Sequence, residues 1–115
     1  MISGSLVITQ NEFPYLLGAR LTEIAGGACA PDADNPSTIV WSNNLTRVRI
    51  HHGKSMALGT IDLAVLDIEQ AALRIRNMGD AKWHRQFEKD GVQIAEVTLK
   101  VTGATYQIWL QQPAA

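Results

Sequence analysis

The residues of this chain that are able to do acid–base or metal chemistry are few and scattered. Its histidines are His51, His52 and His84, and its one cysteine is Cys29. Adjacent side chains of a β-strand point to opposite faces, so His51 and His52 cannot easily bind one ion together. A catalytic zinc site needs three protein ligands, and a reactive thiolate needs an activating neighbour, which cannot be assigned to Cys29. We therefore expect no catalytic residue, no metal site and no cofactor.

A basic stripe is expected on one face of a hairpin over residues 37–52. The chain turns at Asn43-Asn44, because asparagine tolerates a positive φ, and a two-residue turn there places Trp41 opposite Thr46. The alternation then separates an apolar face from a polar one. The apolar face carries Ile39, Trp41, Val48 and Ile50, and the basic stripe consists of Arg47, Arg49 and His51.

The last third of the chain predicts three antiparallel strands, over about 83–88, 92–101 and 104–110. The first turn, at 89–91, allows a two-residue loop or a three-residue loop with a glycine bulge. The apolar pattern favours the three-residue loop, which puts Trp83, Arg85 and Phe87 on the core face. Thr102-Gly103 closes the second turn and adds three residues to the same face, namely Tyr106, Ile108 and Leu110.

This arrangement assigns roles to the charged residues of the last strands. Arg85 is expected on the core side, where a buried charge is usually paired, here with Asp62 or Glu69 of a covering helix. His84 is expected opposite Glu96 on the outer face, with Trp109 on the other side of Glu96. A tryptophan beside basic side chains is able to hold single-stranded RNA. The net charge of −1 favours an ordinary solvated face, because nucleic-acid affinity depends on excess positive charge.

Residues 58–78 predict the clearest helix of the chain. An apolar stripe runs along one face at helical spacing, and Gly79 is well placed to end it. The stripe consists of Ile61, Val65, Ile68, Ala72 and Ile75. Leu63, Leu66 and Leu73 lie off this stripe, so the helix is apolar nearly all round. Left uncovered they form an exposed apolar patch, which marks an association surface; the alternative is that two helices pack on each other.

The element pattern predicts an α+β two-layer sandwich. A strand over 5–10 precedes a first helix, in which Phe13, Leu17, Leu21 and Ile24 recur at helical spacing. The expected order is β-α-β-β-α-β-β-β, with a largely antiparallel sheet and two helices on one face. No internal repeat is visible in the sequence. We expect one α+β domain over residues 1–115.

Composition excludes several classes of protein. Of the 115 residues, 46% are hydrophobic and 18% charged, and the balanced charge argues against a polybasic nucleic-acid binder and an acidic tail. One cysteine cannot form a disulfide within the chain. The N-terminal residues lack the pattern of a secretory signal, and no apolar run is long enough for a membrane span. We therefore expect a cytoplasmic protein with no membrane partner.

Surplus apolar surface without a convergent catalytic group leads to the main hypothesis on function. The chain is expected to be a small non-catalytic homodimer that binds another macromolecule, a protein partner being favoured over nucleic acid. One alternative is a small hydrolase or ligand-binding enzyme with a cluster of His84, Arg85, Glu96 and His52. The other alternative is weak binding of single-stranded RNA. The partner-binding candidates are Leu63, Leu66, Leu73, Arg47, Arg49, His51, His84, Glu96 and Trp109.

Overall fold

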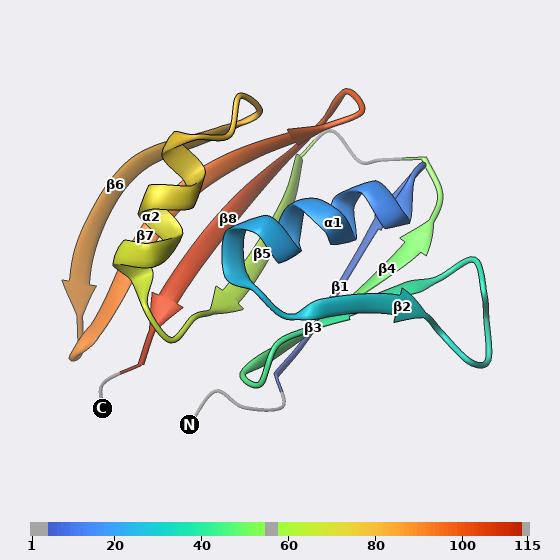
Figure 1. Ribbon diagram of the computed structural model, residues 1–115, viewed down its shortest axis with the longest axis horizontal. Helices are drawn as coiled ribbons and strands as arrows, with labels where there is room; N and C mark the ends of the chain where they lie inside the picture. The colour runs from blue at the N-terminus through green and yellow to red at the C-terminus, as the bar shows by residue number, and fades with distance from the viewer. Residues whose placement is uncertain (1–4, 55–57, 114–115) are drawn as a thin grey trace.

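The computed structural model describes residues 5–54 and 58–113, and it confirms the predicted α+β class (Figure 1). The first half of the chain forms β1 (Ser5–Asn11), α1 (Pro14–Ala25), β2 (Ala28–Pro31), β3 (Ile39–Ser42) and β4 (Thr46–His52). The second half forms β5 (Leu58–Ala64), α2 (Ile68–Arg76), β6 (Ala81–Lys89), β7 (Val92–Val101) and β8 (Ala104–Gln112). Within the described residues, no helix has the length and apolar character needed to cross a membrane.

The two halves have the same topology, although their sequences show no repeat. Each half is a β-α-β-β-β unit that forms a four-stranded sheet, ordered β1-β4-β3-β2 in the first half and β5-β8-β7-β6 in the second. The first strand of each half runs parallel to the last, and the other pairs are antiparallel. The strands β1 and β5 lie in contact, and both helices cover the same side of the strands (Figure 1).

The two halves share one hydrophobic core between the helices and the strands. Its α1 residues are Leu17, Leu21 and Ile24, and residues of both sheets belong to the same cluster of buried side chains. A polar contact also joins the halves, because the hydroxyl of Tyr106 donates to the backbone oxygen of Gln10 at 2.7 Å. The same hydroxyl accepts from Nδ2 of buried Asn11 at 2.8 Å. The single domain over residues 1–115 stays a prediction.

The predicted helix over 58–78 is wrong in its first part. Residues 58–64 form β5, in which Ile61 and Leu63 are buried and Asp62 between them is exposed. The helix α2 begins only at Ile68, where the Asp67 side chain caps it by accepting from the backbone N–H groups of residues 69 and 70. Apolar residues at positions 61, 65, 68 and 75 fit one long helix as well as a strand followed by a helix. Residues 58–64 form a strand because they pair with β8, which the apolar spacing does not reveal.

The hairpin of β3 and β4 has the predicted faces but another register. Trp41 lies opposite Val48 and Ile39 opposite Ile50, two residues away from the predicted pairing. The turn is longer than expected, because Oδ1 of Asn43 accepts hydrogen bonds from the backbone N–H groups of residues 45 and 46. A shift of two residues keeps every side chain on its own face. The apolar face and the basic stripe are therefore both confirmed.

The hairpin of β6 and β7 has the turn of one predicted alternative and the Trp83 pairing of the other. Asp90 and Gly91 both have a positive φ, of 52° and 80°, and form the two-residue turn that was not favoured. A register shift at His84 then changes the faces, so Trp83 lies opposite Val97 as predicted. Arg85 lies opposite Glu96 instead of on the core face, and Phe87 shares its side of the sheet.

Candidate functional site

The face of the two sheets that the helices leave free carries most of the polar side chains of the strands. Two large apolar residues interrupt this face in its centre: Leu6 and Ile8 of β1 have 53% and 63% of their surface exposed. They alternate with Val7, which packs against the core.

Four side chains line up across the second sheet on this free face. Asp62 of β5 lies beside Trp109 of β8, Trp109 beside Glu96 of β7, and Glu96 beside Arg85 of β6. We call these four residues the Trp109 row. Because neighbouring strands are about 4.8 Å apart, the row spans about 14 Å. The tryptophan therefore has a carboxylate on each side.

An ion pair holds one end of the row. Nη2 of Arg85 donates to Oε1 of Glu96 at 2.8 Å, and the Glu96 side chain is largely covered while that of Arg85 is exposed. This hydrogen bond is the main reason why the pKa of Glu96 lies below its ordinary value; partial burial opposes the shift, and the charges of Arg85 and His84 add to it. The same bond raises the pKa of Arg85. Glu96 is therefore a charged hydrogen-bond acceptor and a weak base.

Two aromatic rings, those of Phe87 and Trp109, lie next to this ion pair on the sheet. The guanidinium carbon of Arg85 lies 4.7 Å from the centre of the Phe87 ring. Phe87 meets Trp109 edge to face, with the ring centres 6.5 Å apart and the planes at 85°. Next to the ion pair, Nε2 of His84 lies 2.5 Å from Oγ1 of Thr98. The edge-to-face contact with Phe87 orients the partly buried Trp109 ring.

The opposite end of the row carries a free charge. Asp62 is exposed and makes no ion pair with any residue that the structure describes. In the same described part of the chain, no three His, Cys, Asp or Glu side chains are grouped as metal ligands.

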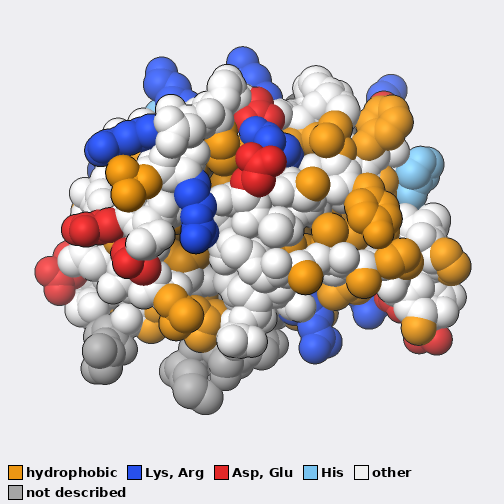
Figure 2. Space-filling model, in the orientation of Figure 1, with side chains coloured by type: hydrophobic (Ala, Val, Ile, Leu, Met, Phe, Trp, Pro, Cys, Tyr) orange, Lys and Arg blue, Asp and Glu red, His pale blue; other side chains and the backbone are white. Residues whose placement is uncertain are grey.

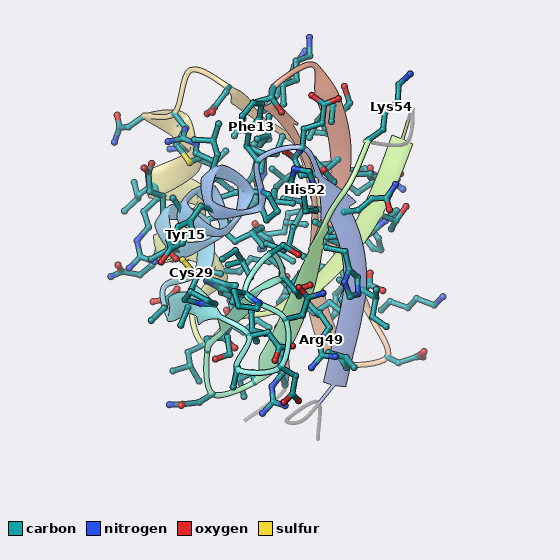
Figure 3. All side chains as sticks on the ribbon, turned by 90° about the vertical axis from the view of Figure 1, so that its right-hand side faces the viewer. Phe13, Tyr15, Cys29, Arg49, His52 and Lys54 are labelled. Carbon is teal, nitrogen blue, oxygen red and sulfur yellow. The ribbon has the colours of Figure 1, made fainter. Side chains whose placement is uncertain are left out.

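The basic stripe lies on the free face of the first sheet. Arg47 is exposed, whereas Nη2 of Arg49 lies 3.2 Å from a carboxylate oxygen of Asp32. Nδ1 of His51 lies 3.1 Å from Oγ1 of Thr38. In Figure 3, Arg49 lies away from α1, whereas Tyr15 belongs to that helix and Cys29 lies near it. RNA binding by this stripe stays a prediction, and the Asp32 contact reduces the positive charge on which it depends.

The predicted leucine patch is absent from the described residues. Leu63 is fully buried in β5, whereas Leu66 lies on the loop before α2 with 78% of its surface exposed. Leu73 is exposed on α2. Since the three residues belong to a strand, a loop and a helix, they do not form one apolar helix face.

Sequence reasoning placed Asp62, Phe87 and Arg85 of this site wrongly. Asp62 was expected on a helix, although the alternation from Thr60 to Leu63 also indicates a strand. Phe87 was expected in the core, although Asp90-Gly91 is a strong signal for the two-residue turn that turns it to the free face. Arg85 does stack on an aromatic ring as expected, but its acidic partner is Glu96.

Comparison with known proteins identifies the fold. No protein-family model and no curated protein matches the chain. Among solved structures, it is similar to TnmS3, an antibiotic binding protein from Streptomyces sp. CB03234, with a TM-score of 0.66 and 13% identity over 96% of this chain and 94% of the other. A glyoxalase-related enzyme from Clostridium phytofermentans gives a TM-score of 0.63 and 8% identity over 98% and 96%.

A third similar structure is FosX, the genomically encoded fosfomycin resistance protein from Listeria monocytogenes. It has a TM-score of 0.62 and 14% identity over 96% of this chain and 94% of the other. The chain therefore has the α+β fold of glyoxalase-related and antibiotic-resistance proteins. Such low identities establish the fold and leave the function to the site itself.

The main hypothesis on function is wrong. It described a non-catalytic homodimer that binds another macromolecule, and it depended on surplus apolar surface along one helix. The burial of Leu63 in β5 removes that premise. The three similar proteins named above are described as a glyoxalase-related enzyme, an antibiotic binding protein and a fosfomycin resistance protein, and none of them as a non-catalytic protein that binds macromolecules.

Proposed function

We propose that this protein binds a small planar aromatic molecule on the free face of its second sheet. The observation that carries the proposal is the partly buried ring of Trp109, which lies between Asp62 and Glu96 in neighbouring strands. A flat aromatic ligand stacks on such a ring, and the exposed Leu6 and Ile8 offer further apolar surface on the same side. Antibiotic binding by a protein of the same fold supports this class of ligand.

The charges beside Trp109 favour a ligand that carries a positive group. Arg85 already neutralises Glu96, whereas Asp62 has no partner among the described residues. A cationic ring over an indole gains about 0.5–2 kcal/mol, the larger value when water is excluded. We therefore expect the positive group of the ligand on the Asp62 side of the ring.

The site supports binding better than hydrolysis. His84, Arg85 and Glu96 do lie together, as the enzyme alternative requires, but His52 lies on the opposite side of its sheet, in line with the buried Val48 and Ile50. Glu96 is bound by Arg85, and its lowered pKa makes it a poor general base near neutral pH. Our proposal is therefore a binding protein, and the expected cytoplasmic location remains part of it.

Titration with proflavine, a planar aromatic cation, tests the proposal. The chain has three tryptophans, of which Trp41 is buried and Trp83 lies on the helix side of its sheet. We expect proflavine to quench tryptophan emission in the parent protein and in Trp83→Phe, and to lose most of this effect in Trp109→Phe. Equal quenching in the two variants would mean that the ligand does not bind at Trp109.

Charge variants test the orientation of the ligand. Asp62→Asn is expected to weaken proflavine binding about three- to fivefold at moderate salt, the size of one exposed charge contact. The matched control is Glu69→Gln, which removes an exposed carboxylate from α2 on the helix side. Anthracene-9-carboxylate, a planar anion, is expected to bind more weakly than proflavine. Tighter binding of the anion would overturn the cationic part of the proposal.

A further inference from the structure

A separate cavity opens on the helix side of the molecule, where the two halves meet. It has a volume of about 650 Å³, which lies within the range of sites that bind drug-sized molecules. One wall consists of the C-terminal end of α1 and the turn between β3 and β4, and the other of the loop before α2 and the adjacent face of α2. Figure 2 shows this side of the molecule, on which apolar side chains are exposed over both halves.

The walls of the cavity are held in place without a ligand. Nδ2 of Asn43 donates to the backbone oxygen of Ala64 at 2.9 Å, so the turn after β3 is tied to the end of β5. Asp67 caps α2 through its Oδ1 atom. Gly27 has a φ of 79°, and an added Cβ would lie 2.2 Å from a backbone oxygen of β3, so the chain after α1 is pressed against that strand. The site is therefore largely preformed.

The lining is apolar at the base and charged along α2. Ile24, Val65 and Ala71 are buried, whereas Leu66 stands exposed at the edge of the cavity. Asp67 and Arg74 are the two charged residues of the lining. They lie seven residues apart on one face of α2, a separation of two turns or about 10 Å.

Arg74 is the polar anchor that a ligand of this cavity would use. Its guanidinium makes no ion pair within the described part of the chain. Asp67, the other charged residue of the lining, caps α2 and forms no ion pair with Arg74. An anion is accordingly favoured at the Arg74 end and disfavoured at the Asp67 end.

We propose that this cavity is a second binding site, for an amphipathic organic anion. The carboxylate or sulfonate of such a molecule accepts hydrogen bonds from Arg74, and its apolar body lies against Ile24 and Val65 and covers Leu66. Leu66 is exposed without a ligand, and burying a side chain of this size on binding is favourable. The site is independent of the Trp109 row, which lies on the opposite side of the strands.

Octanoate and its uncharged analogue octan-1-ol test the site by ¹H–¹⁵N NMR titration. We expect octanoate to shift the amide signals of residues 25–28 and 65–71. Arg74→Gln weakens octanoate binding about tenfold, the value of a charge-assisted hydrogen bond, and leaves octan-1-ol binding unchanged. The matched control Arg76→Gln, an exposed arginine of the same helix outside the cavity lining, leaves both unchanged.

A second pair of variants tests the apolar part. Leu66→Ala weakens both octanoate and octan-1-ol, whereas Leu73→Ala, an equally exposed leucine outside the lining, weakens neither. Trp109→Phe has no effect, which separates this site from the proposed function. Equal effects of Arg74→Gln and Arg76→Gln, shifts that map to the free face of the sheets, or no shift at millimolar octanoate would each overturn the proposal.

Discussion

Removing one hydroxyl group at the junction of the two halves tests how the fold is held together. In Tyr106→Phe, the backbone oxygen of Gln10 loses a donor at 2.7 Å and Nδ2 of Asn11 loses an acceptor at 2.8 Å. Asn11 is completely buried, so its amide cannot turn to water instead. Its Oδ1 atom remains bonded to the backbone N–H of Phe13 and to the hydroxyl of Thr102, which keeps the amide in place.

The magnitude follows from these contacts. Two hydrogen bonds of about 1 kcal/mol each are lost, and the buried Nδ2 group left without a partner adds to the penalty, so we expect a loss of about 2–3 kcal/mol in the free energy of unfolding. In urea denaturation followed by circular dichroism, this corresponds to a midpoint lower by about 1–2 M. Tyr15→Phe is the matched control, because Tyr15 is exposed. A loss below about 0.5 kcal/mol, equal to that of Tyr15→Phe, would refute the assignment of this contact as a buried clamp.

Three further substitutions test individual features of the structure. In the same denaturation assay, Leu63→Ala is expected to lower the free energy of unfolding by about 2–5 kcal/mol, and Leu66→Ala by less than about 0.5 kcal/mol. Similar losses in the two variants would contradict the placement of residue 63 in the core. Gly27→Ala is expected to cost more than about 2 kcal/mol, because a positive φ and a contact with the backbone of β3 both oppose a Cβ, and an unchanged thermal midpoint would count against this close approach. Glu96→Gln removes a carboxylate whose lowered pKa stabilises the folded state above the ordinary pKa of glutamate. The difference in stability between the parent protein and this variant is therefore expected to be largest near neutral pH and to disappear as pH falls through the lowered pKa; a difference that grows on acidification would have the wrong sign.

The faces of β3 and β4 were predictable from the sequence, but their register was not. Trp41 and Val48 were expected on one face and lie there, because alternation depends only on whether a residue position is odd or even. The number of residues in a turn depends on local contacts, here the Asn43 side chain that accepts two backbone hydrogen bonds. Such contacts leave no mark in the apolar pattern.

The division of the chain into two β-α-β-β-β units could not be predicted from the apolar pattern alone. The decisive segment contains Ile61, Val65 and Ile68, whose spacing suits a helix, and only pairing with β8 identifies its first part as a strand. The bulge at His84 is a second feature of this kind. Without it, Trp83 would share the free face with Arg85, which the two-residue turn already places opposite Glu96. Glu96 beside Trp109 was the part of the site that the sequence predicted correctly.

Stacking of an aromatic ligand on Trp109 can be observed through the tryptophan indole N–H signals in a ¹H–¹⁵N spectrum. During titration with proflavine, we expect a large shift of the Trp109 signal. The signal of Trp41, whose Nε1 atom donates to the backbone oxygen of Gly26 at 3.0 Å inside the core, is expected to stay in place, as is that of Trp83. A shift of Trp83 alone, or no shift of any indole signal at saturating proflavine, would contradict stacking on Trp109.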